Sequence, residues 1–239
     1  MIKLAISGCC GRMGARIAEL AQQDSEFKIL AALEIPNHPK LNTPLGGVKI
    51  TSNTAAIKGS DVLIEFTSPE ATMMHLDECV KTETKMIIGT TGLSADQIKK
   101  IKLASKKIPI VFSSNMSVGV NLLFKLVGEL AARTAGKYKV KIVEAHHVHK
   151  KDAPSGTAKT IAQAIERASK YPVEDIQSIR EGEIIGNHDV TFESDVDIIT
   201  IGHHAKTRDI LVQGALVAAK FIAKKKTGLF SMQDVLGLK

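Results

Sequence analysis

The stretch IKLAISGCCGRMG, residues 2–14, decides the fold class of this chain. Its apolar first half, Ile2–Ser7, predicts a buried strand. The glycines that follow, Gly8, Gly11 and Gly14, predict a tight turn in which a pyrophosphate can approach the backbone and a helix can pack closely on the strand. Free N–H groups at the start of that helix favour a negative charge. The stretch therefore predicts a dinucleotide-binding turn.

A carboxylate, Glu34, lies twenty residues past Gly14 and ends a second expected strand. An acid at this distance is placed to accept hydrogen bonds from the ribose hydroxyls of a dinucleotide. Ile35, the next residue, offers no guanidinium to a 2′-phosphate, although His38 or Lys40 could take that role. The sequence therefore predicts NADH or NADPH as the cofactor, with NADH at least as well suited.

Apolar runs alternate with helical periodicity through the first half of the chain, which predicts βαβ units and a parallel sheet. The pattern changes near Asn115 into a longer helix and a separate α+β block. In the first half we expect strands at Ile2–Ser7, Phe27–Glu34, Val62–Phe66, Met86–Gly89 and Ile108–Phe112, helices at Gly14–Gln23, Glu70–Thr82 and Ser94–Ser105, and a loop at Ile35–Gly47. Beyond it we expect helices at Val118–Arg133, Gly156–Ser169 and Ile210–Lys225, and strands at Lys137–Ala145, Gln177–Gly182, Asp189–Glu193 and Asp197–Gly202. The first of these strands alternates in polarity, which puts Val140, Ile142 and Glu144 on one face.

The composition of the chain limits the classes of partner that it can be expected to bind. The chain has 239 residues and a net charge of +7, but only two tyrosines and no tryptophan, so platforms for stacking nucleic-acid bases are scarce. An anionic small substrate and a phosphate-bearing cofactor explain the charge better than nucleic acid does. No apolar run reaches the length of a membrane span, and the three cysteines form no disulfide framework. We therefore expect a cytoplasmic protein with neither a membrane nor a nucleic-acid partner.

Two short loops each follow an expected strand. Because the strands of a parallel sheet end at the same edge, both loops would line one crevice there. Their small polar residues allow backbone contact with a nicotinamide ribose and ring, although loops between strands and helices are often built this way. The residues are Gly89, Thr90, Thr91 and Gly92 in the first loop and Ser113, Ser114, Asn115 and Met116 in the second.

Residues 144–158, EAHHVHKKDAPSGTA, form the most distinctive stretch of the second half. Ser155 is a good N-cap for the helix that follows, and the N–H groups of Gly156 and Thr157 would point outward toward an anion. Lys150 adds positive charge to the loop in front of that helix. The combination predicts a pocket for a carboxylate.

The histidines of this stretch, His146, His147 and His149, have three interpretations. Acid–base catalysis fits best, because histidine titrates near pH 6.5 and a lysine pKa shifts when other cations crowd it. A metal site would need ligands that converge on one point, and only Glu144 and Asp152 could complete such a set. A solvated loop would explain the lysines but not this density of histidine.

The pairing of GCCGRMG at residues 8–14 with the stretch at 144–158 closely resembles the dihydrodipicolinate reductase family, the 4-hydroxy-tetrahydrodipicolinate reductases of the diaminopimelate route to lysine. The resemblance covers nearly the whole chain. Glu65 stands where the family usually has Asp, and Ile35 stands where members that use NADPH can have Arg. The segments that carry it further are 65–67 with 69–70, 89–92, 114–121, Arg180 with Gly182, Gly186 with His188, and 228–230.

The resemblance implies NAD(P)H-dependent reduction of 4-hydroxy-tetrahydrodipicolinate to tetrahydrodipicolinate, with loss of water. It implies that His146 is a catalytic proton donor or acceptor, that Lys150 is a proton donor, and that His147, Gly156 and Thr157 bind the dicarboxylate substrate. No metal is expected. The implied cofactor-binding residues are Gly8, Cys9, Cys10, Gly11, Arg12, Met13, Glu34, Gly89, Thr90, Thr91, Gly92, Ser113, Ser114, Asn115 and Met116.

The resemblance also implies the domain organisation. We expect a Rossmann-like, doubly wound parallel-sheet domain made of residues 1–117 and 208–239, and a smaller α+β domain at 118–207 that binds substrate and builds a homotetramer through its sheet. Two alternatives to the reductase remain: a Rossmann dehydrogenase for another small acid, and a nucleotide-sensing protein without catalysis. The pair of His146 and Lys150 argues against the sensor, because a sensor has no need of an acid–base pair.

Overall fold

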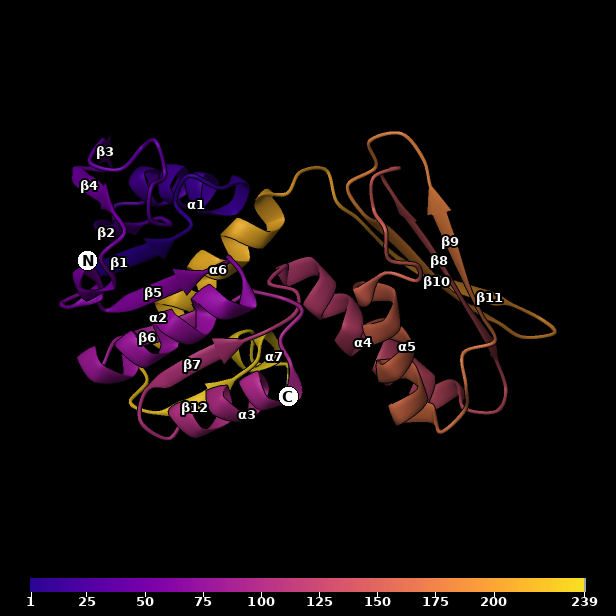
Figure 1. Cartoon of the computed structure of the whole chain (residues 1–239). Helices are drawn as coiled ribbons and strands as arrows, with labels where there is room; N and C mark the ends of the chain where they lie inside the picture. Colours follow the sequence, from indigo (N-terminus) through magenta and orange to yellow (C-terminus); the bar gives the residue numbers. More distant parts are fainter. Residues whose placement is uncertain (239) are drawn as a thin grey trace. The chain divides into compact units, whose positions relative to one another are not determined.

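A computed structural model describes residues 1–238, and these fall into two compact units. The first unit combines Met1–Met116 with Leu211–Gly237, and the second unit is Ser117–Ile210. Figure 1 shows a sheet with helices in each of them. Among the described residues, no helix is both long and apolar enough to cross a membrane.

The first unit contains an eight-stranded sheet in the order β12-β7-β6-β5-β1-β2-β4-β3, in which every pairing is parallel except that of β3 with β4. The expectation of a parallel, Rossmann-like sheet is confirmed. The strands are β1 (Ile2–Ser7), β2 (Phe27–Leu33), β3 (Pro44–Leu45), β4 (Val48–Thr51), β5 (Val62–Glu65), β6 (Lys85–Ile88), β7 (Pro109–Phe112) and β12 (Gly228–Phe230).

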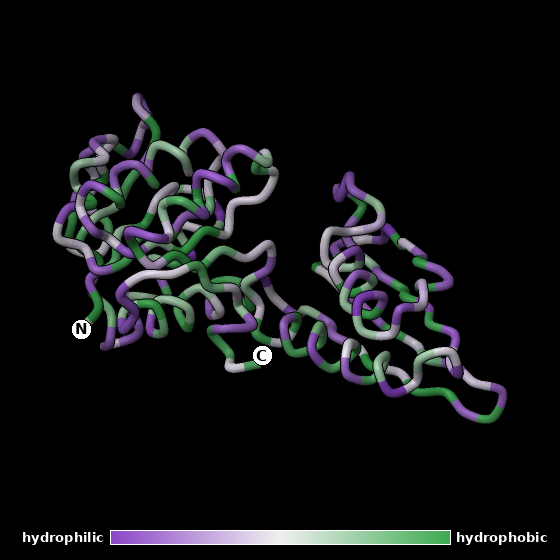
Figure 2. Tube along the Cα trace, turned by 90° about the horizontal axis from the view of Figure 1, so that it is seen from below, coloured by the Kyte–Doolittle hydropathy of each residue, from purple (hydrophilic) through white to green (hydrophobic). Residues whose placement is uncertain are grey.

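Helices cover both faces of this sheet. On one face lie α1 (Arg12–Gln23), α6 (Asp209–Ile222) and α7 (Met232–Val235), and on the other lie the 3-10 helix η1 (Thr54–Ile57), α2 (Pro69–Thr82) and α3 (Ala95–Ala104). Neighbouring residues of β5 show the two layers: Ile64 packs in the cluster of α1 and α6, and Leu63 packs in the cluster of α2 and α3. In Figure 2 hydrophobic stretches run through the interior of this unit.

The strand order reverses beside β1. The chain adds β2 and β4 on one side of β1, and then β5, β6, β7 and β12 on the other. The connections that leave β1 and β5 therefore run in opposite directions, which opens a crevice at the carboxyl ends of these two strands. Ligands of open α/β sheets bind at such a point.

The structure differs from the expected elements in several places. The helix after the glycine turn begins at Arg12, with Gly11 as its N-cap, so Gly14 lies inside the first turn. The expected loop Ile35–Gly47 contains the two-residue strand β3, while β4, η1, β12 and α7 were not expected at all. Each of these spans only two to four residues, too few for a repeat of apolar positions to be recognisable.

The second unit pairs a four-stranded sheet, in the order β11-β10-β8-β9, with two helices. Its strands are β8 (Lys139–His146), β9 (Asp175–Arg180), β10 (Asn187–Glu193) and β11 (Ile198–His204), and its helices are α4 (Val118–Thr134) and α5 (Gly156–Ser169). Both helices pack on one face of the sheet, where Val127 and Ile161 meet Ile142 and Phe192. The smaller α+β block is confirmed, although β9 begins two residues before the expected Gln177.

The alternation expected in β8 is also confirmed. Val140, Ile142, Glu144 and His146 are buried, whereas Lys139 and Lys141 are exposed. Two polar residues therefore continue the buried face of an apolar strand. The parallel pairing of β8 with β9 sets His146 opposite Arg180.

We predict that Gly14→Ala lowers the free energy of unfolding by about 2 kcal/mol or more, because a Cβ at residue 14 would lie 2.1 Å from the backbone oxygen of Gly8. Urea denaturation would measure the change. The matched control is Gly128→Ala in α4, where the nearest contact of the added Cβ is an ordinary 3.7 Å. There the helix should gain up to about 1 kcal/mol. Equal stability of Gly14→Ala and the parent would contradict the close packing of this turn.

Candidate active site

The glycine turn places backbone atoms without side chains at the crevice. Gly8 has a φ of 58°, a left-handed conformation that favours glycine, and a Cβ there would lie 2.8 Å from Cγ2 of Thr67. A Cβ at Gly89 would lie 2.1 Å from the ring of Phe66. Side chains larger than hydrogen are thus excluded from the ends of β1 and β6, as close approach of a phosphate group to the backbone requires.

A cavity of about 410 Å³ lies at this end of the sheet. Glu34 lies at the cavity and is held in place: its Oε1 accepts a 2.9 Å hydrogen bond from the Cys10 N–H, and its Oε2 accepts one of 2.9 Å from the Ile35 N–H. The structure therefore brings Gly8, Gly11 and Glu34 together. The lining residues are Gly8, Gly11, Leu33, Glu34, Ile35, Pro36, Ser52, Thr54, Phe66, Thr67, Ser68, Ala71, Met74 and His75.

The other expected cofactor residues do not line this cavity. Cys9 is fully buried in the core against α1, and Cys10 and Met13 are half-buried beside that core. Arg12 is exposed at the start of α1. In the loop after β6, the Thr90 hydroxyl oxygen accepts hydrogen bonds from the Thr67 N–H and from the Thr72 hydroxyl. The residues at 113–116 follow β7 and do not line the cavity.

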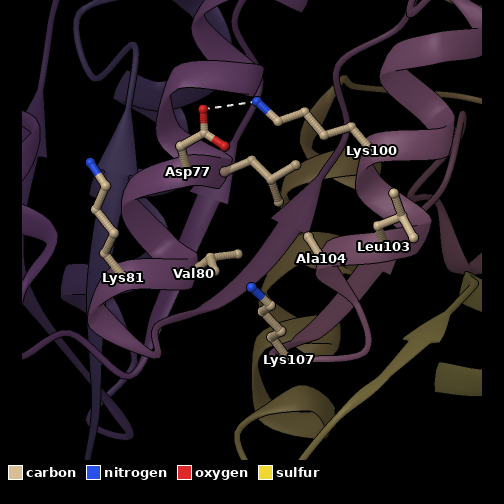
Figure 3. A pocket seen from close by; sticks show the side chains of 8 residues that line it. Asp77, Val80, Lys81, Lys100, Leu103, Ala104 and Lys107 are labelled. Atoms are coloured by element: carbon tan, nitrogen blue, oxygen red, sulfur yellow. Dashed lines mark hydrogen bonds and ion pairs between the residues drawn. The ribbon is translucent and has the colours of Figure 1, made fainter.

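A second cavity of about 410 Å³ lies between α2 and α3. Figure 3 shows its apolar floor and its lysine side chains, one of which, Lys100, forms a 2.8 Å ion pair with Asp77. None of the residues predicted to bind cofactor or substrate lines it. Only the cavity at the glycine turn, of these two, therefore matches the predicted cofactor site.

Glu65 holds Thr67, which lines the cavity at the glycine turn. This carboxylate is 0% exposed at the end of β5, and it pairs with Nδ1 of His75 at 2.5 Å. Its Oε1 also accepts hydrogen bonds from the N–H of Thr67, at 3.0 Å, and from the Thr67 hydroxyl. Sequence reasoning marked Glu65 only as a departure from the family pattern, because no local signal showed that its partner would be a histidine ten residues later.

A buried carboxylate, Glu144, organises the second unit in the same way. Arg180 donates from Nη2 to Oε1 at 2.8 Å and from Nη1 to Oε2 at 3.1 Å. The Ser155 N–H donates to Oε1 at 3.1 Å, and Nδ1 of His146 lies 2.5 Å from Oε2. Burial alone would raise the pKa of Glu144, but Arg180 and the other donors hold it down to about 2. The carboxylate is therefore ionised.

His146 is aligned by this carboxylate. Its Nδ1–H donates to Glu144, so Nε2 faces the other way, and Gly186 leaves room there because a Cβ would come within 3.1 Å of Nε2. Burial lowers the pKa of His146, and the charges of Lys150 and Arg180 act in the same direction. His188 meets its ring edge-on at 5.2 Å, and burial lowers the pKa of His188 to about 4. His146 is thus a neutral imidazole at neutral pH that can exchange a proton at Nε2.

Lys150 and the start of α5 supply positive charge beside His146. The Lys150 ammonium forms a 2.8 Å ion pair with Asp152. The Ser155 side chain caps α5 by accepting a 3.1 Å hydrogen bond from the Ala158 N–H, and Gly156 is exposed at the first position of the helix. His147 is half-buried, with its Nε2 3.5 Å from Nη2 of Arg208.

The metal interpretation of the histidine stretch loses support from the contacts. Among residues 1–238, the potential ligand atoms that converge within 4.8 Å are those of Glu144, His146 and His188, together with a second set at Cys9, Cys10 and Glu34. In the first set both carboxylate oxygens already accept hydrogen bonds from Arg180. In the second, burial raises the pKa of Cys9 to about 12, which disfavours the thiolate that a metal needs.

Sequence reasoning gave no role to Arg180 or His188, which complete this site. Arg180 entered only through the family pattern. Its position depends on the pairing of β9 with β8, because only that register sets it beside Glu144. His188 comes from β10, which pairs with β8 on the other side. No spacing within the sequence signals either contact.

A Rossmann-type sheet with a bare glycine turn, joined to a unit with a carboxylate-aligned histidine, defines a nicotinamide-nucleotide-dependent oxidoreductase. The family model described as "Dihydrodipicolinate reductase, N-terminus" matches residues 2–116, and "Dihydrodipicolinate reductase, C-terminus" matches residues 119–236. The chain belongs to the dihydrodipicolinate reductase family.

Relatives that align with the whole chain support its assignment to this family. The 4-hydroxy-tetrahydrodipicolinate reductases of Polynucleobacter necessarius subsp. necessarius and Nitrosomonas eutropha are 42% and 40% identical to this chain; both alignments cover 100% of it, and they cover 100% and 99% of the relatives. A dipicolinate-bound dihydrodipicolinate reductase from Paenisporosarcina sp. TG-14 has the same fold, with a TM-score of 0.84 at 24% identity over 98% of both chains. An amine dehydrogenase from Mycobacterium smegmatis shares the fold at a TM-score of 0.66 and 10% identity, over 97% of this chain and 95% of that one.

Proposed function

We propose that this protein reduces 4-hydroxy-tetrahydrodipicolinate to tetrahydrodipicolinate in the diaminopimelate route to lysine. The observation that carries the proposal is the match of the whole chain to both halves of the family and to relatives named for this activity. The reaction consumes one NAD(P)H and one proton, and it releases NAD(P)⁺ and water.

The nucleotide would be held in the first unit. The bare turn around Gly8 and the fixed Glu34 carboxylate support this assignment, because they suit a pyrophosphate and a ribose. Once bound, the nicotinamide supplies the hydride that adds to ring carbon C4 of the dehydrated substrate. The residues that we propose for this site are Gly8, Cys9, Cys10, Gly11, Arg12, Met13, Glu34, Gly89, Thr90, Thr91, Gly92, Ser113, Ser114, Asn115 and Met116.

The second unit would hold the substrate and deliver its proton. We propose that His147, Gly156 and Thr157 bind substrate carboxylates, since helix N–H groups and cationic side chains favour anions. After hydride addition the electrons move toward the ring nitrogen, and a ring carbon takes up a proton. The Lys150 ammonium is the candidate donor, and Nε2 of the neutral His146 imidazole is the candidate acceptor, which can donate only after it has taken up a proton. Glu144 would keep the His146 ring in the orientation and tautomer that this transfer needs.

The product of the preceding synthase, offered with NADH or NADPH, tests the function and the cofactor preference together. We predict loss of nicotinamide absorbance, with a kcat/KM for NADH at least equal to that for NADPH, because the Glu34 carboxylate at the cavity repels a 2′-phosphate. A strong preference for NADPH would contradict the role of Glu34. Turnover of another imino or keto acid, with none of this substrate, would favour a different dehydrogenase.

Lys150→Ala tests the proton-donor role. We predict a fall in kcat of about 10²–10⁴-fold, the usual contribution of a positioned acid, and little change in the affinity for NADH. Stopped-flow turnover and fluorescence titration of NADH measure the two effects. Lys151→Ala is the matched control, since it removes the same charge from the exposed neighbouring side chain. Full turnover by Lys150→Ala would remove this lysine from the mechanism.

We further propose a homotetramer built through the second unit. Its helices cover one face of the sheet, and Val143 of β8, Thr191 of β10 and Ile198 of β11 have their side chains on the other face. Ile198 is 62% exposed, a large apolar side chain that an interface would bury. We predict a sedimentation mass of four chains, reduced by Thr191→Lys and unaffected by Lys125→Ala on the exposed surface of α4. A monomer at micromolar concentration would contradict this assembly.

We also propose that the reaction takes place in the cytoplasm. Cys9, Cys10 and Cys79 are free, and thiols stay reduced in that compartment. Cell fractionation would test the location, and recovery in a membrane or secreted fraction would contradict it.

A further inference from the structure

Asp152 lies beside Lys150 in the loop in front of α5. Its Oδ1 lies 2.8 Å from Nζ of Lys150. Its backbone carbonyl accepts a 2.5 Å hydrogen bond from Nη2 of Arg180, the guanidinium that Glu144 fixes. The main chain of Asp152 is therefore anchored to the buried network, while its side chain, 52% exposed, remains free to turn.

The Lys150 ammonium is the main partner of this carboxylate. The hydrogen bond from Lys150 makes the largest contribution to lowering the pKa of Asp152, and the backbone N–H of Gly156 acts in the same direction. An ammonium group and a first-turn helix amide are together the groups that a bound carboxylate would use. In the free protein the Asp152 carboxylate already pairs with the ammonium of Lys150.

We propose that Asp152 stands in for one carboxylate of the substrate in the free protein and gives up its place when the substrate binds. The proposal rests on the proposed function, because it takes Lys150 and the start of α5 as part of the substrate site. The exchange replaces one anion by another, so Lys150 keeps a counter-charge throughout. A ligand that is neutral at this position cannot make the exchange and must leave Asp152 where it is.

The strength of the internal ion pair decides whether the exchange is feasible. Ion pairs between solvent-exposed groups stabilise a structure by no more than about 1 kcal/mol, and half of the Asp152 side chain is exposed. Competition from Asp152 therefore weakens the binding of an incoming carboxylate by about fivefold at most. That factor is small enough for a dicarboxylate to overcome. Asp152 is thus a specificity-determining residue, since it makes charge a condition for entry into the pocket.

Asp152→Asn isolates the charge. The amide keeps the size of the side chain, and the backbone carbonyl that accepts from Arg180 is unchanged. Titration calorimetry with pyridine-2,6-dicarboxylate (dipicolinate) as the probe should give a Kd about two- to fivefold lower than that of the parent. Asp152→Ser should shift the Kd in the same direction. In steady-state assays the KM for the substrate should fall by the same factor.

Glu183→Gln is the matched control. It also removes one negative charge from an exposed loop, where Glu183 lies 3.8 Å from His149, but it does not contact Lys150. Its Kd for the dicarboxylate should stay at the value of the parent, because exposed charges at a distance are screened by salt. An equal gain in affinity for Glu183→Gln would show a general charge effect and overturn the proposal.

Two further results would overturn it. One is an Asp152→Asn variant whose Kd is unchanged or higher, which would mean that Asp152 only holds Lys150 in place. The other is the absence of dicarboxylate binding in both the parent and this variant. Failure of the proposed function looks different: the dicarboxylate binds and Asp152→Asn tightens it, while 4-hydroxy-tetrahydrodipicolinate gives no consumption of NADH or NADPH.

Discussion

The pairing of the buried Glu144 carboxylate with Arg180 is the interaction on which the second unit depends. A carboxylate with 0% exposure is tolerated only when hydrogen bonds and an opposite charge replace the water it has lost. Here the partners come from three segments: Arg180 from β9, Ser155 from the start of α5, and His146 from β8 itself. Loss of one partner of a buried ion pair typically costs about 3–5 kcal/mol, so strand register, helix start and histidine orientation are coupled.

The first unit uses the same arrangement in another setting. Glu65 also lies at the carboxyl end of a strand, is fully buried, and bonds Nδ1 of a histidine at 2.5 Å. There the carboxylate fixes the backbone and hydroxyl of Thr67, which lines the cavity at the glycine turn, and its partners among the described residues are a histidine and a threonine in place of an arginine. Each proposed ligand site therefore has rigid polar support that neither substrate nor nucleotide has to organise on binding.

Short-range patterns in the sequence were sufficient for the glycine turn, for Glu34 and for the alternation of β8, because each depends on neighbours along the chain. They placed Glu144 on the same face as Val140 and Ile142 before any partner was known. They could not place Arg180 or His188, because these contacts arise from strand pairings that the chain makes after long connections. Short edge strands such as β3 were not predicted for another reason, since two residues show no periodicity.

The late position of β12 in the sequence affects the order in which the two units can fold during translation. Leu229 of β12 pairs with Ile110 of β7, so the edge of the first unit's sheet is completed by residues close to the carboxyl end. During synthesis β7 leaves the ribosome well before its partner, and its edge stays open while the whole second unit is translated. The second unit can fold as soon as it emerges, whereas the nascent first unit waits with an unpaired strand. Chaperones that shield such edges would act in that interval.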